Sequence, residues 1–108
     1  MDVELAIWEL NQAPWERADP LWTLFAYRFA RYMLDQTRHD LSAGLPRVSA
    51  GTRDQLLRAI ASISANIGEG YSRSTTRERT RFYTFALGST REAISWYEIG
   101  RASCRERV

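Results

Sequence analysis

The sequence predicts an all-α protein folded as an antiparallel up-down helical bundle. Apolar residues recur at helical spacing in three stretches, at about residues 20–39, 52–68 and 75–97. Long runs that alternate apolar and polar residues, as half-buried strands do, are missing from the 108 residues. A loop from Leu41 to Ser49, marked by Gly44 and Pro46, joins the first two stretches, and a sharp turn joins the second stretch to the third as in a helical hairpin.

The first long helix is predicted at residues 20–39. Asp19 and Pro20 form a typical helix start, because Asp caps the first turn and Pro suits the first helical position. The residues before it, 1–18, are predicted to be an acidic N-terminal leader with a short amphipathic helix from Val3 to Leu10, interrupted at Pro14. The apolar stripe of the long helix steps by four residues: Leu21, Phe25, Phe29 and Met33.

The second helix is predicted at residues 52–68, with Thr52 and Gln55 as its capping box. We expect it to end in a sharp elbow, where two glycines adopt positive φ and two polar side chains bond the free backbone groups. A structural role explains this turn with fewer assumptions than a functional site does. Its residues are Asn66, Gly68, Glu69 and Gly70.

The third helix is predicted at residues 75–97, with Thr75 and Glu78 as its capping box. Gly88 and Ser89 lie in mid-helix, where glycine costs about 1 kcal/mol of helix propensity, so we expect a neighbouring helix to approach closely there. The apolar stripe of this helix is Phe82, Phe85 with Ala86, Ser89, Ala93 and Trp96.

Residues 98–108 show no apolar period, and we predict that they form a non-native tail. They can be written as codons that resemble a common short-read sequencing adapter. The bland alternative is a frayed, arginine-rich tail. Because of this hypothesis we exclude its polar residues from functional reasoning. They are Arg101, Cys104, Arg105 and Arg107.

Composition limits the function classes. A chain of 108 residues forms one domain with a modest core. The single cysteine excludes an intramolecular disulfide and a cysteine-based zinc site. An acidic N-terminus and the lack of a long apolar run predict a cytoplasmic protein with no signal peptide and no contact with a membrane.

The sequence carries no catalytic constellation, so we expect a protein that is not an enzyme and holds no cofactor or metal. His39, the only histidine, lies near the predicted end of a helix, where a histidine usually completes carbonyl groups. No Gly-x-Ser-x-Gly motif marks a nucleophile. Gly68-Glu69-Gly70 lacks the Lys-Ser/Thr of a phosphate-binding loop.

All fifteen basic residues are arginines, and they are unevenly distributed. Residues 1–46 hold four arginines against seven acids, a net charge of −3, and residues 47–108 hold eleven against six, a net charge of +5. Arginines on one face of the third helix, together with two near the second, would bind a phosphate backbone in a salt-dependent, sequence-tolerant way. The alternative is a solvated face partly neutralised by glutamates. The candidates are Arg58, Arg73, Arg77, Arg81 and Arg91.

One motif carries a resemblance. Residues 62–73, SISANIGEGYSR, are followed by Arg81-Phe82-Tyr83 and then by Ala86-Leu87-Gly88-Ser89. From about residue 19 to residue 97 the chain resembles the bacterial four-helix-bundle family of 23S rRNA-intervening-sequence proteins, to which the accessory variability determinant of diversity-generating retroelements is similar.

The resemblance implies a four-helix bundle whose fourth helix is truncated in this chain. It also implies a homo-oligomer, a pentamer, that binds RNA or DNA through the candidate arginines and, in the retroelement branch, binds a reverse transcriptase. The alternative is a purely structural or protein-interaction module with no nucleic-acid role. Its partner would fill a groove over Phe82 and Trp96.

Overall fold

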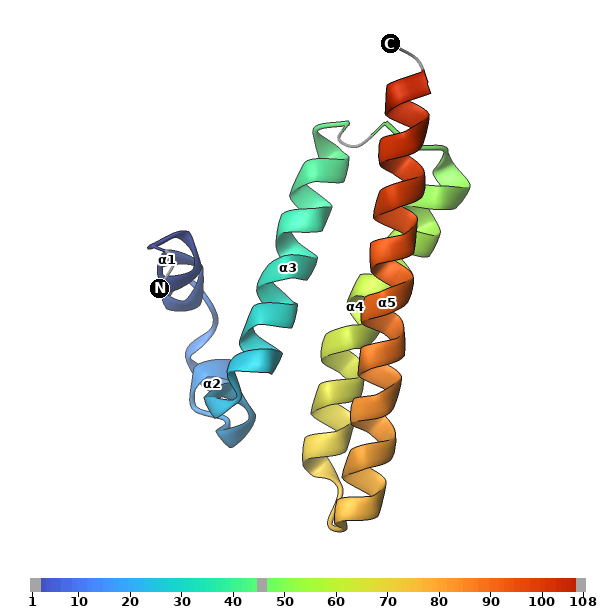
Figure 1. The fold of residues 1–108 in the computed structure, drawn as a ribbon. Helices are drawn as coiled ribbons and strands as arrows, with labels where there is room; N and C mark the ends of the chain where they lie inside the picture. The colour runs from blue at the N-terminus through green and yellow to red at the C-terminus, as the bar shows by residue number, and fades with distance from the viewer. Residues whose placement is uncertain (1–2, 45–46, 107–108) are drawn as a thin grey trace.

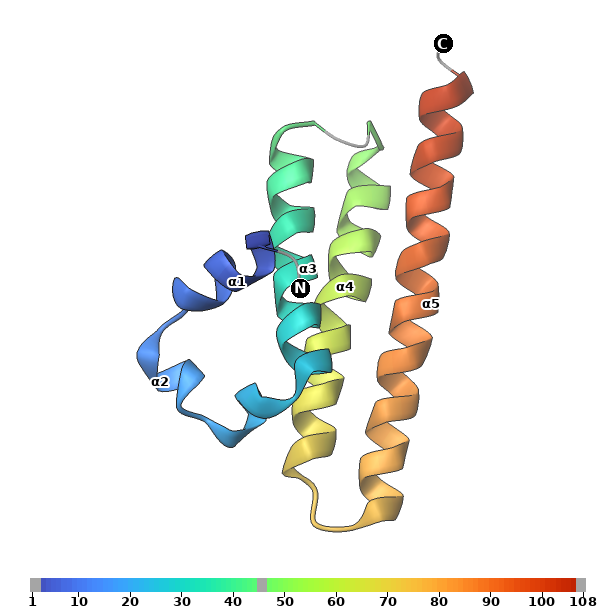
Figure 2. The same cartoon turned by 60° about the vertical axis from the view of Figure 1, so that its left-hand side comes forward.

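The computed structural model describes residues 3–44 and 47–106, and for residues 101–106 it describes the backbone only. Three long helices dominate: α3 (Phe25–Ser42), α4 (Ala50–Ser72) and α5 (Thr76–Glu106). They lie side by side, with α4 packed against both of the others (Figures 1 and 2). The chain folds back between α3 and α4 and again between α4 and α5. The prediction of an all-α helical bundle is confirmed, and the described residues contain no strand.

Three short helices precede the bundle and pack on α3: α1 (Val3–Leu10), α2 (Pro14–Arg17) and the 3₁₀ helix η1 (Pro20–Thr23). Helices α1 and α2 lie on the side of α3 that faces away from α4 and α5 (Figures 1 and 2), while η1 reaches α4, where Leu21 lies opposite Gly68. The short helix predicted before Pro14 is confirmed with its bounds. The acidic segment is therefore folded against the bundle.

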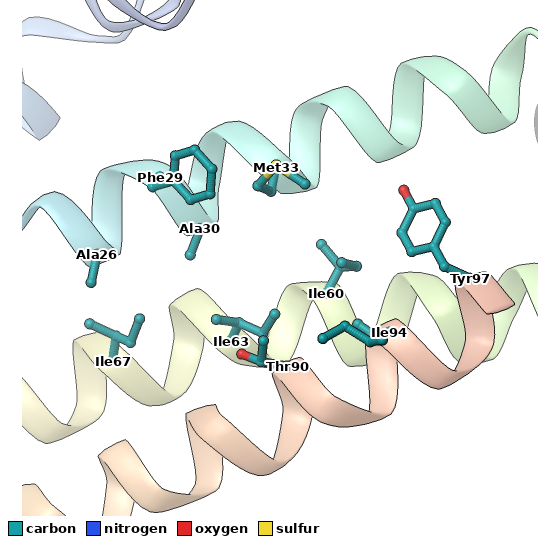
Figure 3. A pocket seen from close by; sticks show the side chains of 11 residues that line it. Ala26, Phe29, Ala30, Met33, Ile60, Ile63, Ile67, Thr90, Ile94 and Tyr97 are labelled. Carbon is teal, nitrogen blue, oxygen red and sulfur yellow. The ribbon is translucent and has the colours of Figure 1, made fainter. Parts of the chain in front are cut away.

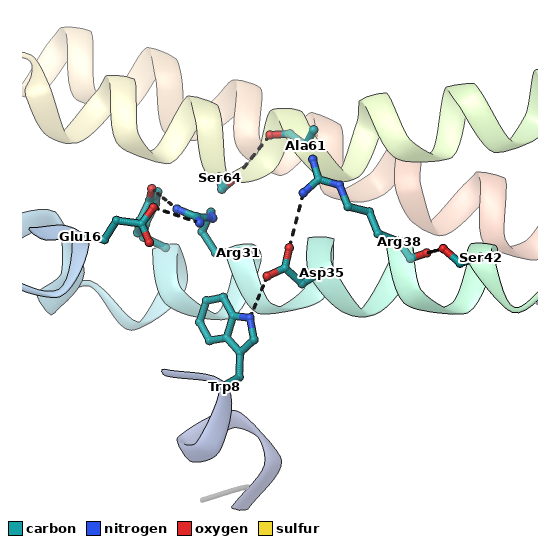
Figure 4. A network of polar contacts seen from close by, with 9 residues as sticks. Trp8, Glu16, Arg31, Asp35, Arg38, Ser42, Ala61 and Ser64 are labelled. Atoms are coloured by element: carbon teal, nitrogen blue, oxygen red, sulfur yellow. Dashed lines mark hydrogen bonds and ion pairs between the residues drawn. The ribbon is translucent and has the colours of Figure 1, made fainter. Parts of the chain in front are cut away.

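Polar and aromatic contacts fasten this segment to α3. The Trp8 ring stacks on Trp22 with ring centroids 5.8 Å apart. The Trp8 indole Nε1 donates a hydrogen bond of 2.8 Å to Asp35 Oδ2 (Figure 4). The Arg31 guanidinium donates to Glu16 Oε1 at 3.3 Å (Figure 4). Both ion-pair partners are partly buried, so the contact positions α2 more firmly than an exposed pair would.

The first long helix begins later than predicted. Asp19 accepts a hydrogen bond from the Leu21 backbone N–H at 2.9 Å, as expected of a cap, but it caps only the 3₁₀ turn η1. Leu24 then adopts extended dihedral angles, so α3 begins at Phe25. It ends at Ser42 instead of near residue 39, and Gly44, with φ of +83°, follows it.

The predicted elbow is wrong. Helix α4 runs through Gly68 and Gly70 to Ser72, and among the described residues only Gly44 has positive φ. The reversal lies at residues 73–75 instead. The N-cap is also displaced from Thr52, because Ser49 Oγ accepts the Thr52 backbone N–H at 3.1 Å. The helix therefore extends beyond the sequence bounds at both ends, from Ala50 to Ser72.

Gly70 and Gly88 both lie within helices, and their surroundings differ from those predicted. A Cβ on Gly70 would lie 2.7 Å from Cε1 of the Tyr83 ring, so Gly70 allows α4 and α5 to approach closely. A Cβ on Gly88 would meet nothing within 4 Å, which contradicts the close approach expected there. At the next position, Ser89, a hydrogen bond of 2.7 Å from Ser62 Oγ links α4 to α5.

Helix α5 begins as predicted and continues further. Thr75 Oγ1 accepts the Glu78 backbone N–H at 3.2 Å, which caps the first turn. The helix then continues past the predicted end at residue 97 to Glu106. The side chains of the excluded tail residues lie outside the described part of the chain: Arg101, Cys104, Arg105 and Arg107.

The core lies where α3, α4 and α5 meet. Leu56 is fully buried at 0% exposure and lies at the centre of it. The buried Thr37 hydroxyl and the Tyr97 hydroxyl lie 2.9 Å apart, a hydrogen bond that ties α3 to α5. The apolar members of the core cluster are Leu34, Leu41, Leu56, Ala59, Ile60 and Ala93.

Candidate nucleic-acid interface

The α4–α5 hairpin carries all five candidate arginines. Arg77, Arg81 and Arg91 are exposed on α5. At 100° per residue their directions from the helix axis fall within about 80° of one another, so they share one face. From the first to the last the rise is about 21 Å along the axis. The helix therefore presents a row of cations long enough to follow several phosphates of a nucleic-acid strand.

Arg73 lies at the turn into α5 and is held by its neighbours. Its guanidinium lies over the Phe82 ring, 4.8 Å from the centroid, and donates to Glu69 Oε2 at 3.1 Å. Its Nε is buried and has no hydrogen-bond partner among the described residues. Its backbone carbonyl accepts a hydrogen bond from Arg79 Nε at 2.7 Å. Arg73 is thus fixed in orientation, while Glu69 partly neutralises its charge.

Sequence reasoning missed Arg79 and Phe85. Arg79 is exposed beside the turn, and its position in the run from Arg73 to Arg81 was the available signal. Phe85 was assigned to the apolar stripe, yet 45% of it is exposed and the Arg81 guanidinium lies 5.5 Å from its ring centroid. An exposed aromatic ring beside arginines is a surface on which a nucleobase can stack.

Arg58 is the one candidate within α4. It is exposed and lies eleven residues before Glu69, which is three turns of helix, so the two share a side. Arg58 therefore extends the basic surface along α4. Acidic residues interrupt that surface at Glu69, Glu78 and Glu92, and all three are exposed. The face is moderately basic.

The residues predicted to form the turn do not form a polar site. Asn66 donates from Nδ2 to the Ser62 carbonyl at 2.8 Å, within its own helix. Glu69 pairs with Arg73. Gly68 faces η1 and α3, where an added Cβ would lie 3.5 Å from Leu21 Cδ2. Each residue has a local structural role, although not the role of ending a helix.

An apolar groove runs along the bundle over α4, between α3 and α5 (Figure 3). One cavity of about 360 Å³ is followed by a second of about 400 Å³, and both are lined by Ala26, Ile63, Ile67 and Thr90. The groove predicted over Phe82 and Trp96 stays a prediction, and neither residue lines these two cavities. Trp96 packs against the core.

Two titratable groups outside the hairpin, Arg31 and His39, lie on α3. Burial lowers the pKa of Arg31, but its contacts with Tyr27 and Glu16 raise it by more, so the pKa of this guanidinium lies above its ordinary value. His39 is exposed near the end of α3. Among the described side chains, those of residues 3–44 and 47–100, no cluster of metal-ligating groups is present. None of the described helices is long and apolar enough to cross a membrane.

The model of a family described as 23S rRNA-intervening sequence protein matches residues 26–104, which include α4, most of α3 and nearly all of α5. The matched region includes all five candidate arginines. No curated protein and no solved structure matches the chain.

Proposed function

The chain belongs to the 23S rRNA-intervening sequence protein family, and from this we propose that it is a non-catalytic, homo-oligomeric helical bundle that binds nucleic acid. The observation that carries the proposal is the row of exposed arginines on one face of α5. Arg73 at the turn and Arg58 on α4 add positive charge to the same hairpin, and Arg79 lies on another side of α5. A cationic face without base-reading elements favours contacts with the phosphate backbone.

This mode of binding has definite properties. Arginine contacts phosphate oxygens through two N–H groups at once, and the contact carries no sequence information. Affinity therefore falls steeply with salt and differs little between RNA and DNA sequences of equal length. The exposed glutamates Glu78 and Glu92 reduce the positive field. We expect moderate affinity, with a large salt dependence.

The assembled form is part of the same proposal. We take the bundle as an antiparallel up-down four-helix arrangement, whose fourth position is the groove between α3 and α5. The family resemblance favours a pentamer in the cytoplasm and, for members linked to retroelements, a reverse transcriptase as protein partner. In such a ring the arginine face of each copy would repeat and multiply weak contacts.

The test is fluorescence anisotropy with labelled 20-base-pair RNA and DNA duplexes at low salt. The triple variant Arg77→Ala, Arg81→Ala and Arg91→Ala should lose about tenfold or more in affinity, because each removed cation releases one counterion fewer. The control removes the same charge from exposed positions outside the hairpin. Its substitutions are Arg17→Ala, Arg38→Ala and Arg47→Ala. An equal loss of affinity in both triple variants would show an effect of net charge alone and would refute the proposal that the arginine face of α5 binds nucleic acid.

A protein-interaction module without a nucleic-acid role is the second candidate, and the open apolar groove favours it. Ile94 is 58% exposed at the groove edge, so Ile94→Glu should disrupt capture of a partner there. Reversing the charge of Arg77 and Arg81 would then change nothing. The opposite pattern, sensitivity to the arginines alone, supports the first candidate.

A further inference from the structure

Phe85 presents an aromatic ring to solvent beside the arginine face of α5. The residue is 45% exposed. The Arg81 guanidinium lies 5.5 Å from the centroid of its ring, and the Phe82 ring packs against it at 89° with centroids 5.8 Å apart. These two neighbours hold the ring in place and leave almost half of the side chain uncovered. A ring held in this way beside a cation is suited to stacking on another planar group.

The exposure of Phe85 does not depend on what fills the groove over α4. Thr90 and Ile94 line that groove from α5. At 100° per residue they point about 140° and 180° away from Phe85 around the helix axis. A helix lying in the groove would therefore leave the ring open.

The next turn of α5 carries only small residues beside the ring. Helical side chains lean towards the N-terminus, so side chains at positions 88 and 89 would lie over the turn that holds Phe85. Gly88 has none, and a Cβ there would meet nothing within 4 Å. Ser89 is short and is bonded to Ser62 Oγ on α4 at 2.7 Å. Glycine weakens a helix at this position without improving its packing. What Gly88 provides is an open approach to the ring.

The charges around the ring favour a ligand that carries phosphate. Arg77 and Arg81 lie two turns and one turn before Phe85, within about 80° of it around the axis. Arg81 forms no ion pair within the described part of the chain. The acids on this side are Glu78 and Glu92, and each lies about 10 Å from Phe85 along the axis. The charge nearest the ring is therefore positive and available to a phosphate.

We propose that this surface binds single-stranded nucleic acid, with an unpaired base stacked on Phe85. Bases in a duplex stack on one another, whereas unpaired bases can stack on an aromatic side chain. Arg77 and Arg81 contact phosphates of the same strand, and Gly88 leaves room for the base. Stacking uses the flat face that every base has, so the preference for sequence is weak. The inference rests on the proposed function and names the form of nucleic acid that the arginine face binds.

Phe85→Leu tests the stack, because it removes the ring and keeps an apolar side chain. In fluorescence anisotropy its affinity for labelled strands of 20 thymidines or 20 uridines should fall about fivefold or more, the loss expected for one stacked base. The stronger-binding strand identifies DNA or RNA as the preferred ligand. Affinity for the 20-base-pair duplex should not change measurably. The salt dependence of single-strand binding should keep its slope, since no phosphate contact is lost. Phe85→Trp keeps an aromatic ring and should bind as the wild type does.

Phe25 on α3 provides the matched control. It is 51% exposed and the Arg28 guanidinium lies 5.6 Å from its ring centroid, but Arg28 is paired with Glu9 at 3.0 Å. Phe25→Leu should leave single-strand affinity unchanged. Gly88→Leu should lower it, because the new side chain leans over the ring of Phe85. Gly88→Ala should not, since its Cβ stays clear of other groups. Circular dichroism checks that each variant keeps its helix content.

The outcomes separate this inference from the proposed function. Unchanged single-strand affinity in Phe85→Leu, or an equal loss for single strand and duplex, would overturn the stack on Phe85. The arginine face would still stand if the triple arginine variant weakened the binding of both ligands. A wild type that binds neither ligand at low salt would overturn the stack and the proposed function together.

Discussion

At the scale of single residues, the glycines of the motif have structural roles that differ from those predicted from the sequence. Gly70 is helical and lies against Tyr83 and Phe82, so its missing side chain allows two helices to pack closely. Gly88 is helical and faces open space. The positive φ expected at the motif occurs at Gly44, in the other connection.

Substituting alanine at these two glycines should therefore have opposite effects. Gly88→Ala should stabilise the protein by about 0.5–1 kcal/mol, since alanine loses less backbone entropy in a helix. Gly70→Ala gains the same stabilisation from backbone entropy, but it places a Cβ 2.7 Å from the Tyr83 ring and 3.2 Å from Phe82 Cβ. Overpacking of this kind costs about 1–3 kcal/mol. Urea unfolding of both variants measures the difference, and stabilisation by Gly70→Ala would contradict the close packing.

The same residues show what sequence can and cannot give at this scale. The spacing of Asn66, Gly68 and Gly70 indicated that the chain reverses nearby, and the reversal does follow at residues 73–75. Backbone propensity alone favoured a turn there, because glycine in mid-helix is costly. The compensation comes from Tyr83 and Phe82 on another helix, a tertiary contact that no local pattern reveals. Exposure of Phe85 was hidden for the same reason.

At the scale of elements, helix ends were the least predictable feature. The caps at Asp19 and Thr75 accept the expected backbone hydrogen bonds. Yet the Asp19 cap begins only a 3₁₀ turn, because Leu24 is extended and interrupts the helix. The cap of α4 is Ser49 and not Thr52, since Ser49 Oγ accepts the Thr52 backbone N–H. Apolar periodicity predicted that the three long helices exist, but it did not predict where they begin and end.

The cap of α4 gives a direct test. Ser49→Ala removes the acceptor of the Thr52 backbone N–H and should cost about 1 kcal/mol of stability. Thr52→Ala leaves that backbone bond in place and should change stability by less than about 0.5 kcal/mol, because the higher helix propensity of alanine offsets the lost exposed hydrogen bond from Ser49 Oγ to Thr52 Oγ1. Chemical denaturation of the two variants distinguishes the caps. A larger loss for Thr52→Ala would restore the cap predicted from sequence.

At the scale of the whole molecule, the all-α bundle and the gathering of arginines on one hairpin were predictable. Helical periodicity placed Arg77, Arg81 and Arg91 on a shared face, and the structure leaves all three exposed. The position of the N-terminal segment on α3 was not predictable, because it depends on the Trp8 contacts with Trp22 and Asp35. The two cavities over α4 could not be placed from sequence, since the side chains that line them come from three helices.

The most direct test of the central claim is the salt dependence of nucleic-acid binding. The logarithm of the association constant for a DNA duplex should fall linearly with the logarithm of the salt concentration. The slope should become shallower by about two to three units when Arg77, Arg81 and Arg91 are changed together to alanine, since each lost phosphate contact removes about 0.9 unit. A wild-type slope near zero, or a slope that the triple variant leaves unchanged, would contradict the account.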